Sequence, residues 1–98
     1  MTVQKTIQNQ TLTIAPEGRL DTITAPQLES ELRSSLEGMT ELVFDLEKLV
    51  YISSAGLRVL LSAQKTMNKQ GTMVLTNVRP EIMEILEITG FADILTIR

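Results

Sequence analysis

The first fourteen residues alternate between apolar and polar side chains on both sides of a short polar break. The positions that carry the pattern are Val3, Lys5 and Ile7, and then Leu12, Thr13 and Ile14, with Asn9-Gln10 between the two groups. A period of two is typical of half-buried strands, and a short polar break between two such runs is typical of a turn. The pattern predicts two antiparallel strands. Pro16 and Gly18 limit how far the second strand stays regular.

The next segment has the period of a helix. Its leucines recur every four residues, at Leu28, Leu32 and Leu36. Thr24 and Gln27 have the spacing of a capping box, and Pro26 suits the first turn of a helix. Gly38 is a natural C-terminal stop. We therefore expect a helix between Thr24 and Gly38, with its leucine stripe facing the core.

The rest of the chain alternates between short apolar runs and helical patterns. Residues 42–46 form a near-continuous apolar run, which is typical of a central strand covered on both faces. Two further helices are marked by Leu57, Leu60, Leu61 and Met67, and by Ile82, Ile85 and Leu86. Gly71 and Gly90 end these helices, and Pro80 opens the second one. Residues 72–76 and 94–97 are the remaining strands that we expect.

The expected element order is therefore β-β-α-β-α-β-α-β. Alternating strands and helices imply βαβ crossovers and hence a mostly parallel sheet, which the opening hairpin makes mixed. The 98 residues fit one domain over 1–98, and a hydrophobic fraction of 43% supports a substantial core. We predict a single α/β domain with a mixed sheet and helices packed against it.

Composition excludes several classes of function. Aromatic residues make up 3% of the chain, Trp is absent, and the net charge is −3. Base-stacking platforms and basic patches, which nucleic-acid binding needs, are therefore not expected. The chain has no Cys, no apolar run of membrane-spanning length and no apolar leader, so we expect a cytoplasmic protein that does not insert into a membrane.

The doublet Ser53-Ser54 precedes the second helical pattern without the partners of a catalytic serine. The chain has no His to act as base, and no nucleophile-elbow or P-loop motif. No His/Cys cluster could hold a transition metal, and nothing sets the separation of Asp21 and Asp45 as a carboxylate pair. We expect no enzyme activity, no cofactor and no metal, with a Ser-Lys nucleophile left as the remote alternative.

The simplest reading of the doublet is a helix cap, which needs only one serine. The second hydroxyl and the bare turn at Ala55-Gly56 remain to be explained. Small residues allow another protein or a kinase to come close, and a helix N-terminus tolerates a phosphate. The segment therefore fits a phosphorylation switch better than a catalytic site.

Three segments of the chain resemble the STAS domain, and more narrowly the bacterial anti-sigma factor antagonists. They are GRLDTITAPQLESEL (18–32), LVFDLEKLVYISSAGLRVLL (42–61) and EILEITGFADIL (84–95). The most specific part is the pattern D-L-x-x-L/V-x-x-I-x-S-x-G-L. The resemblance implies that the unphosphorylated protein binds a cognate anti-sigma factor, usually a serine kinase, and so releases a sigma factor. It also implies that the kinase phosphorylates the antagonist with ATP and that a phosphatase restores it.

The resemblance also assigns residues. It places the phosphorylated serine on Ser54, which we also expect at the N-cap, and the acidic residue near it on Asp21. Ser53 stands where many members have Asp, and so it is an alternative acceptor. Ala55 stands where relatives often carry Ser or Thr. The expected partner-binding residues are Asp21, Ser53, Ser54, Ala55, Gly56 and Leu57.

Structural roles for these residues stay open beside the functional ones. Asp21 could cap the next turn, Leu57 could be plain core, and Arg58 is expected to be a solvated helix charge. The alternative functions are a STAS subunit of another signalling or transport assembly, and a small enzyme with Ser54 as nucleophile.

Overall fold

A five-stranded mixed sheet forms the base of the structure, a computed structural model that describes residues 1–98. Its strands are β1 (Thr2–Gln8), β2 (Thr11–Leu20), β3 (Glu41–Asp45), β4 (Leu49–Ile52) and β5 (Thr72–Thr76). The spatial order is β1-β2-β3-β5, and β4 also pairs with β2. Strands β1 and β2 are antiparallel and the other pairs are parallel, which confirms the predicted mixed sheet.

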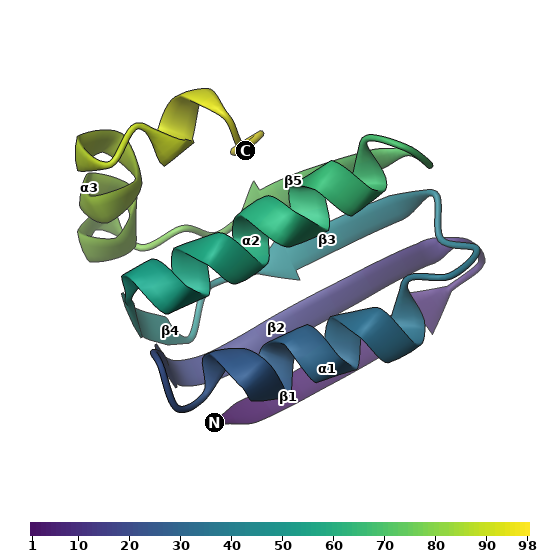
Figure 1. The fold of residues 1–98 in the computed structure, drawn as a ribbon, viewed down its shortest axis with the longest axis horizontal. Coiled ribbons are helices and arrows are strands. Elements are labelled where there is room, and N and C mark those ends of the chain that lie inside the picture. Colours follow the sequence, from purple (N-terminus) through teal and green to yellow (C-terminus); the bar gives the residue numbers. More distant parts are fainter.

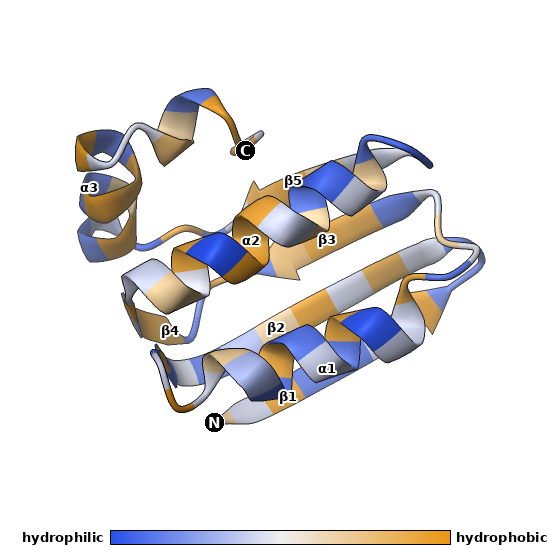
Figure 2. Cartoon of the chain, in the orientation of Figure 1, coloured by the Kyte–Doolittle hydropathy of each residue, from blue (hydrophilic) through white to orange (hydrophobic).

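Three α-helices and one 3-10 turn complete the fold. They are α1 (Ala25–Ser35), α2 (Ser54–Met67), α3 (Pro80–Ile88) and η1 (Phe91–Asp93). Helices α1 and α2 run beside each other over the sheet, whereas α3 packs against β4 at one end (Figure 1). The leucine stripe of α1 and the apolar face of α2 are buried. Apolar residues colour much of β3, β5 and α3, and they alternate with polar ones along β2 (Figure 2).

Burial along β3 corrects one expectation. Leu42 and Phe44 are completely buried, but Val43 between them is only half-buried. The apolar run at 42–46 therefore belongs to a strand that is fully covered on one face and only partly on the other. A run of apolar residues alone does not distinguish these two cases.

The predicted element order is confirmed, with one strand added and one shortened. Strand β4 is absent from the sequence prediction. The expected strand over 94–97 is reduced to a single parallel bridge between Leu75 and Ile97. Phe91–Asp93 forms a 3-10 turn and Ile94 keeps helical backbone angles, so too few extended residues remain for a strand.

Strand β2 changes partner along its length. Residues 11–14 pair with β3, whereas Gly18, Arg19 and Leu20 pair with β4, and the register shifts between Gly18 and Arg19. Gly18 has a φ of +96°, which side-chain-bearing residues rarely adopt. This bend brings the end of β2 alongside β4, at the edge of the sheet where the candidate site lies.

We predict that Gly18→Val lowers the free energy of unfolding by about 1–3 kcal/mol through backbone strain alone. A Cβ at this position would meet no atom within 4 Å, so no clash contributes. Gly18→Asn should lower the free energy of unfolding by less than Gly18→Val does, because Asn tolerates positive φ better than a β-branched residue. Urea denaturation measures the ranking, with Ala15→Val in the same strand as control. Equal losses for Val and Asn would contradict the strain argument.

Candidate functional site

The carboxyl ends of β2 and β4 meet at one edge of the sheet. The backbone N–H of Ser53 donates to the Leu20 carbonyl over 2.9 Å. Asp21 follows directly after β2, and Ser53-Ser54 follows directly after β4. The structure thus brings together the two segments that the sequence singled out separately. This edge is also where ligands and partners commonly meet sheets of this kind.

Ser53, and not Ser54, is the N-cap of α2. Its backbone is extended (φ −98°, ψ 176°), and its Oγ accepts a long hydrogen bond of 3.4 Å from the Gly56 N–H. Its carbonyl accepts the first helical bond, from the Leu57 N–H at 2.9 Å. The expectation that Ser54 caps the helix was therefore wrong. The helix begins one residue earlier than expected, at Ser54, and so the half-buried Ser53 takes the capping role.

Ser54 is the first residue of α2 and is exposed. Its hydroxyl makes no hydrogen bond to the protein, whereas the neighbouring Ser53 hydroxyl does. No histidine exists in the chain to take its proton. The Ser54 hydroxyl is thus open to a reagent that comes from outside, and no side chain of this protein is hydrogen-bonded to it as a general base would be.

Asp21 organises the loop between β2 and α1. Its Oδ1 accepts from the backbone N–H groups of Ile23 (3.0 Å) and Thr24 (3.1 Å), and Arg19 Nε lies 3.8 Å from its Oδ2. The hydrogen bond from the Thr24 backbone, followed by the other bonds and the Arg19 charge, lowers the pKa of Asp21 despite partial desolvation. Asp21 thus caps the turn after β2, which is the structural role that the sequence left open for it.

The predicted capping box between Thr24 and Gln27 is not formed. The Thr24 hydroxyl donates to the Arg19 carbonyl (2.7 Å) and accepts from the Asp21 N–H (2.8 Å). Gln27 Nε2 donates instead to the Met1 carbonyl (3.1 Å). Asp21 takes up the backbone N–H of Thr24, and so α1 begins from a loop that Asp21 holds.

Gly56 and Leu57 lie on the buried side of α2, which corrects their expected exposure to a partner. A Cβ on Gly56 would lie 2.7 Å from Leu20 Cγ and 2.8 Å from Ile52 Cγ1. Leu57 belongs to the core, with 5% of its surface exposed. Residue 56 is therefore small because the helix packs closely on β2 and β4, and both residues contribute to the packing beneath the surface.

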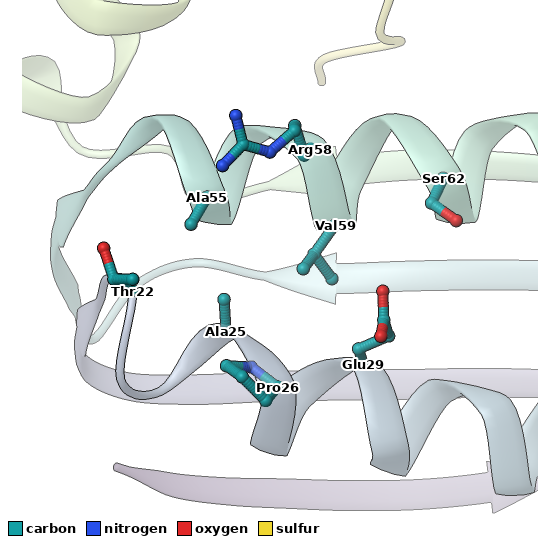
Figure 3. A pocket seen from close by; sticks show the side chains of 8 residues that line it. All are labelled: Thr22, Ala25, Pro26, Glu29, Ala55, Arg58, Val59 and Ser62. Atoms are coloured by element: carbon teal, nitrogen blue, oxygen red, sulfur yellow. The ribbon is translucent and has the colours of Figure 1, made fainter.

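A groove of about 380 Å³ runs between α1 and α2 beside the serine doublet (Figure 3). It is lined by Thr22, Ala25, Pro26, Glu29, Ala55, Arg58, Val59 and Ser62. Arg58 is exposed and makes no ion pair, whereas Glu29 pairs with Arg33 at 3.1 Å. Ile23, in the adjacent loop, is 85% exposed. Sequence reasoning connected neither Ile23 nor Arg58 with the site, although the four-residue spacing of Ser54 and Arg58 was visible.

The remaining acidic candidate, Asp45, holds a turn of its own. Its Oδ1 accepts from the Glu47 N–H (3.1 Å) and from Asn77 Nδ2 (3.0 Å).

No group of three His, Cys, Asp or Glu residues is placed to bind a metal ion. None of the helices combines the length and the apolar character needed to cross a bilayer.

The family model of the STAS domain matches residues 2–98. The chain belongs to the STAS domain family. BtrV of Bordetella bronchiseptica, which is named as an anti-sigma factor antagonist, is 42% identical over 80 residues, 80% of this chain and 69% of BtrV. The anti-sigma-B factor antagonist of Listeria monocytogenes is 33% identical over 84 residues, 83% of this chain and 73% of that protein.

Solved structures of STAS proteins share the fold. TM1081 of Thermotoga maritima superposes with a TM-score of 0.89 over 97% of this chain and 84% of its own, at 17% identity. Unphosphorylated SpoIIAA superposes with a TM-score of 0.78 over 99% of this chain and 87% of its own, at 18% identity. Phosphorylated SpoIIAA of Bacillus gives 0.77 over 99% and 91%, at 18% identity. A sulfate transporter family protein of Wolinella succinogenes gives 0.78 over 93% and 75%, at 21% identity.

We predict that Gly56→Ala lowers the free energy of unfolding by about 1–2 kcal/mol. Helix propensity alone would favour Ala by about 0.5–1 kcal/mol, but overpacking against Leu20 and Ile52 costs about 1–3 kcal/mol. Urea denaturation measures the change. Lys65→Ala, at an exposed position of the same helix, should change stability by less than about 0.5 kcal/mol. A more stable Gly56→Ala protein would show that the neighbours move aside freely.

We predict that Asp21 stabilises the fold in a pH-dependent way. Its pKa is lowered from the ordinary value of 3.8, so its stabilising effect is present above pH 3.8 and is lost as the pH falls through the lower folded value. Asp21→Asn keeps an oxygen acceptor for the loop but has no charge. Its melting temperature should lie below that of the wild type at neutral pH, and the two should converge in acid.

Thermal melts from about pH 7 to about pH 3 measure this convergence. Glu84→Gln is the control, because Glu84 is exposed and makes no ion pair. A constant difference between wild type and Asp21→Asn across this range would show that the Asp21 charge is not what stabilises the loop.

Proposed function

We propose that this protein is an anti-sigma factor antagonist that a serine kinase controls by phosphorylating Ser54. In the unphosphorylated state it binds its cognate anti-sigma factor in the cytoplasm and so releases a sigma factor. The relatives BtrV and the Listeria protein support this class of function by name and by identity. The observation that carries the proposal is the exposed, unbonded Ser54 hydroxyl beside the Asp21 loop.

The switching reaction is a phosphoryl transfer between the two proteins. The Ser54 oxygen forms a bond to the γ-phosphorus of ATP, the bond from that phosphorus to the β–γ bridging oxygen breaks, and ADP leaves. A base of the kinase takes the hydroxyl proton, because this chain has no histidine. A phosphoserine phosphatase reverses the modification by hydrolysis. The bond between phosphorus and the Ser54 oxygen breaks, the oxygen of water binds to phosphorus, and inorganic phosphate leaves.

Exposure favours Ser54 over Ser53 as the acceptor. Ser53 is half-buried and its Oγ already accepts from the Gly56 N–H, whereas Ser54 projects into solvent. A kinase that reaches this turn meets Ser54 first. The proposed docking surface is therefore formed by Asp21, Ser53, Ser54 and Ala55, while Gly56 and Leu57 support it from below.

Phosphorylation at this position is expected to change binding without changing the fold. The first turn of α2 has unpaired N–H groups and the positive end of the helix dipole, which tolerate a dianion. A docked partner would strip water from the phosphate, and an unpaired buried charge costs several kcal/mol. The likeness of this chain to both phosphorylated and unphosphorylated SpoIIAA supports the first half of this argument.

A second candidate function is a STAS subunit of another assembly. The shared fold of the Wolinella sulfate transporter family protein favours this alternative. In that case the bound protein would be a permease or a signalling complex and not a kinase. An enzyme that uses Ser54 as nucleophile has less support, because no base lies beside its hydroxyl.

We predict that phosphorylation of Ser54 weakens binding to the anti-sigma factor at least about tenfold, which corresponds to about 1.4 kcal/mol. The melting temperature should change by only a few degrees, because the helix end tolerates the charge. Ser54→Ala should bind like the unmodified protein but accept no phosphate. Calorimetry of the three forms measures affinity and melting, and mass spectrometry measures phosphate.

A matched pair of charge variants controls for a general effect of added charge. Ser54→Asp should weaken binding, whereas Ser34→Asp, at an exposed position near the end of α1, should not. Equal affinities of the phosphorylated and unphosphorylated proteins would contradict the switch. Undiminished phosphate on Ser54→Ala would move the acceptor to Ser53.

A further inference from the structure

We propose that Arg58 is the counter-ion of a phosphate on Ser54, so that phosphorylation closes an ion pair within α2. The proposal rests on the phosphorylation of Ser54 proposed above. It gives a regulatory role to a charge that would otherwise be an ordinary solvated residue of an exposed helix face.

The spacing and direction of the two side chains carry the inference. Ser54 and Arg58 are four residues apart in α2, and so they are neighbours on successive turns of one face. Side chains on a helix lean toward its N-terminus, which directs the later residue onto the earlier one. Figure 3 shows the Arg58 guanidinium reaching back toward Ala55 at the start of the helix and away from Glu29.

Arg58 is free to take this role because no acidic group of the protein holds it. The nearby acidic side chains have other partners: Glu29 lies 3.1 Å from Arg33, and Asp21 holds its own loop and lies 3.8 Å from Arg19. Arg19 itself stacks over the Tyr51 ring, 4.1 Å from its centroid. Arg58 is therefore the unpaired cation of the groove beside the serine doublet.

The chemistry of the two groups fits. A phosphoserine carries a charge of about −1.5 to −2 at neutral pH and three acceptor oxygens. A guanidinium offers a planar fork of donors that can bind two of these oxygens at once. The acidic group is N-terminal to the basic one, which is the more favourable order in a helix. The pair would hold the phosphate over Ala55. Phosphorylation would then neutralise the free positive charge of the groove while it adds negative charge to the docking surface.

The test is a titration of the phosphate itself, on full-length protein with phosphoserine incorporated at position 54 during translation. Phosphorus NMR gives its second pKa, which is about 6 in the absence of partners. We expect this pKa to be higher in Arg58→Gln than in the wild type by about 0.3–0.7 of a pH unit. Lys65→Gln, two turns further along the same helix, should titrate like the wild type, and Arg58→Lys should lie between wild type and Arg58→Gln.

The other charges that face the site are present in every variant compared. Asp21 and Glu29 raise the phosphate pKa, whereas Arg19 and the N–H groups of the helix end lower it. Their effects cancel in the difference between wild type and Arg58→Gln. Equal pKa values in these two proteins would overturn the proposal. A shift of the same size in Lys65→Gln would also overturn it, because the effect would then be one of net charge.

Placing the phosphoserine at position 53 gives an independent check. Residue 53 lies outside the helix and five residues before Arg58, so its phosphate pKa should respond less to Arg58→Gln. An equal or larger response at position 53 would overturn the assignment of the pair to Ser54. No kinase or anti-sigma factor is present in these titrations. The ion pair can therefore fail while the proposed switch holds, and a failure to bind an anti-sigma factor leaves the titration result unaffected.

Discussion

The hydrogen bond from the Ser53 N–H to the Leu20 carbonyl is the constraint on which the candidate site depends. It joins the ends of β2 and β4, whose last residues, Leu20 and Ile52, are register partners although α1 and β3 lie between them in the chain. Gly56 then allows α2 to pack directly on those two residues. If the helix started further from the sheet, Ser54 and Arg58 would move outward together, away from the Asp21 loop. The exposed site is thus positioned by packing beneath it.

Long periodic segments of the fold could be predicted from the sequence, and short ones could not. The leucines of α1 and the apolar face of α2 repeat over several turns, so their period stands out from local variation. Strand β4 has only four residues, Val50 within it is half-exposed, and a helix follows almost at once. It is a strand because β2 bends at Gly18 and presents an edge to it. The bend at Gly18 lies about thirty residues before β4 in the chain, so the local sequence of β4 does not reveal that it will pair as a strand.

The site residues could be found from the sequence more readily than their roles could be separated. Ser53, Ser54 and Asp21 were identified, but which serine caps α2 depends on a boundary of one residue, and pattern reasoning does not resolve helix ends that finely. Gly56 was expected to make room for a partner. It makes room for Leu20 and Ile52 instead, because a small residue at a helix start can face either side, and only the three-dimensional packing decides which.

The division between Ser53 and Ser54 follows from helix geometry. Ser53 is the N-cap and has an extended backbone, whereas Ser54 is the first residue of the helix, so the two adjacent side chains leave the backbone in different directions. Here the first is turned toward the backbone of its own helix and is half-buried, and the second is turned into solvent. A charge added to the exposed hydroxyl leaves the capping hydroxyl and the Leu20 hydrogen bond in place. The adjacent serines therefore allow the surface of this turn to change its charge while the contacts that position the turn are kept.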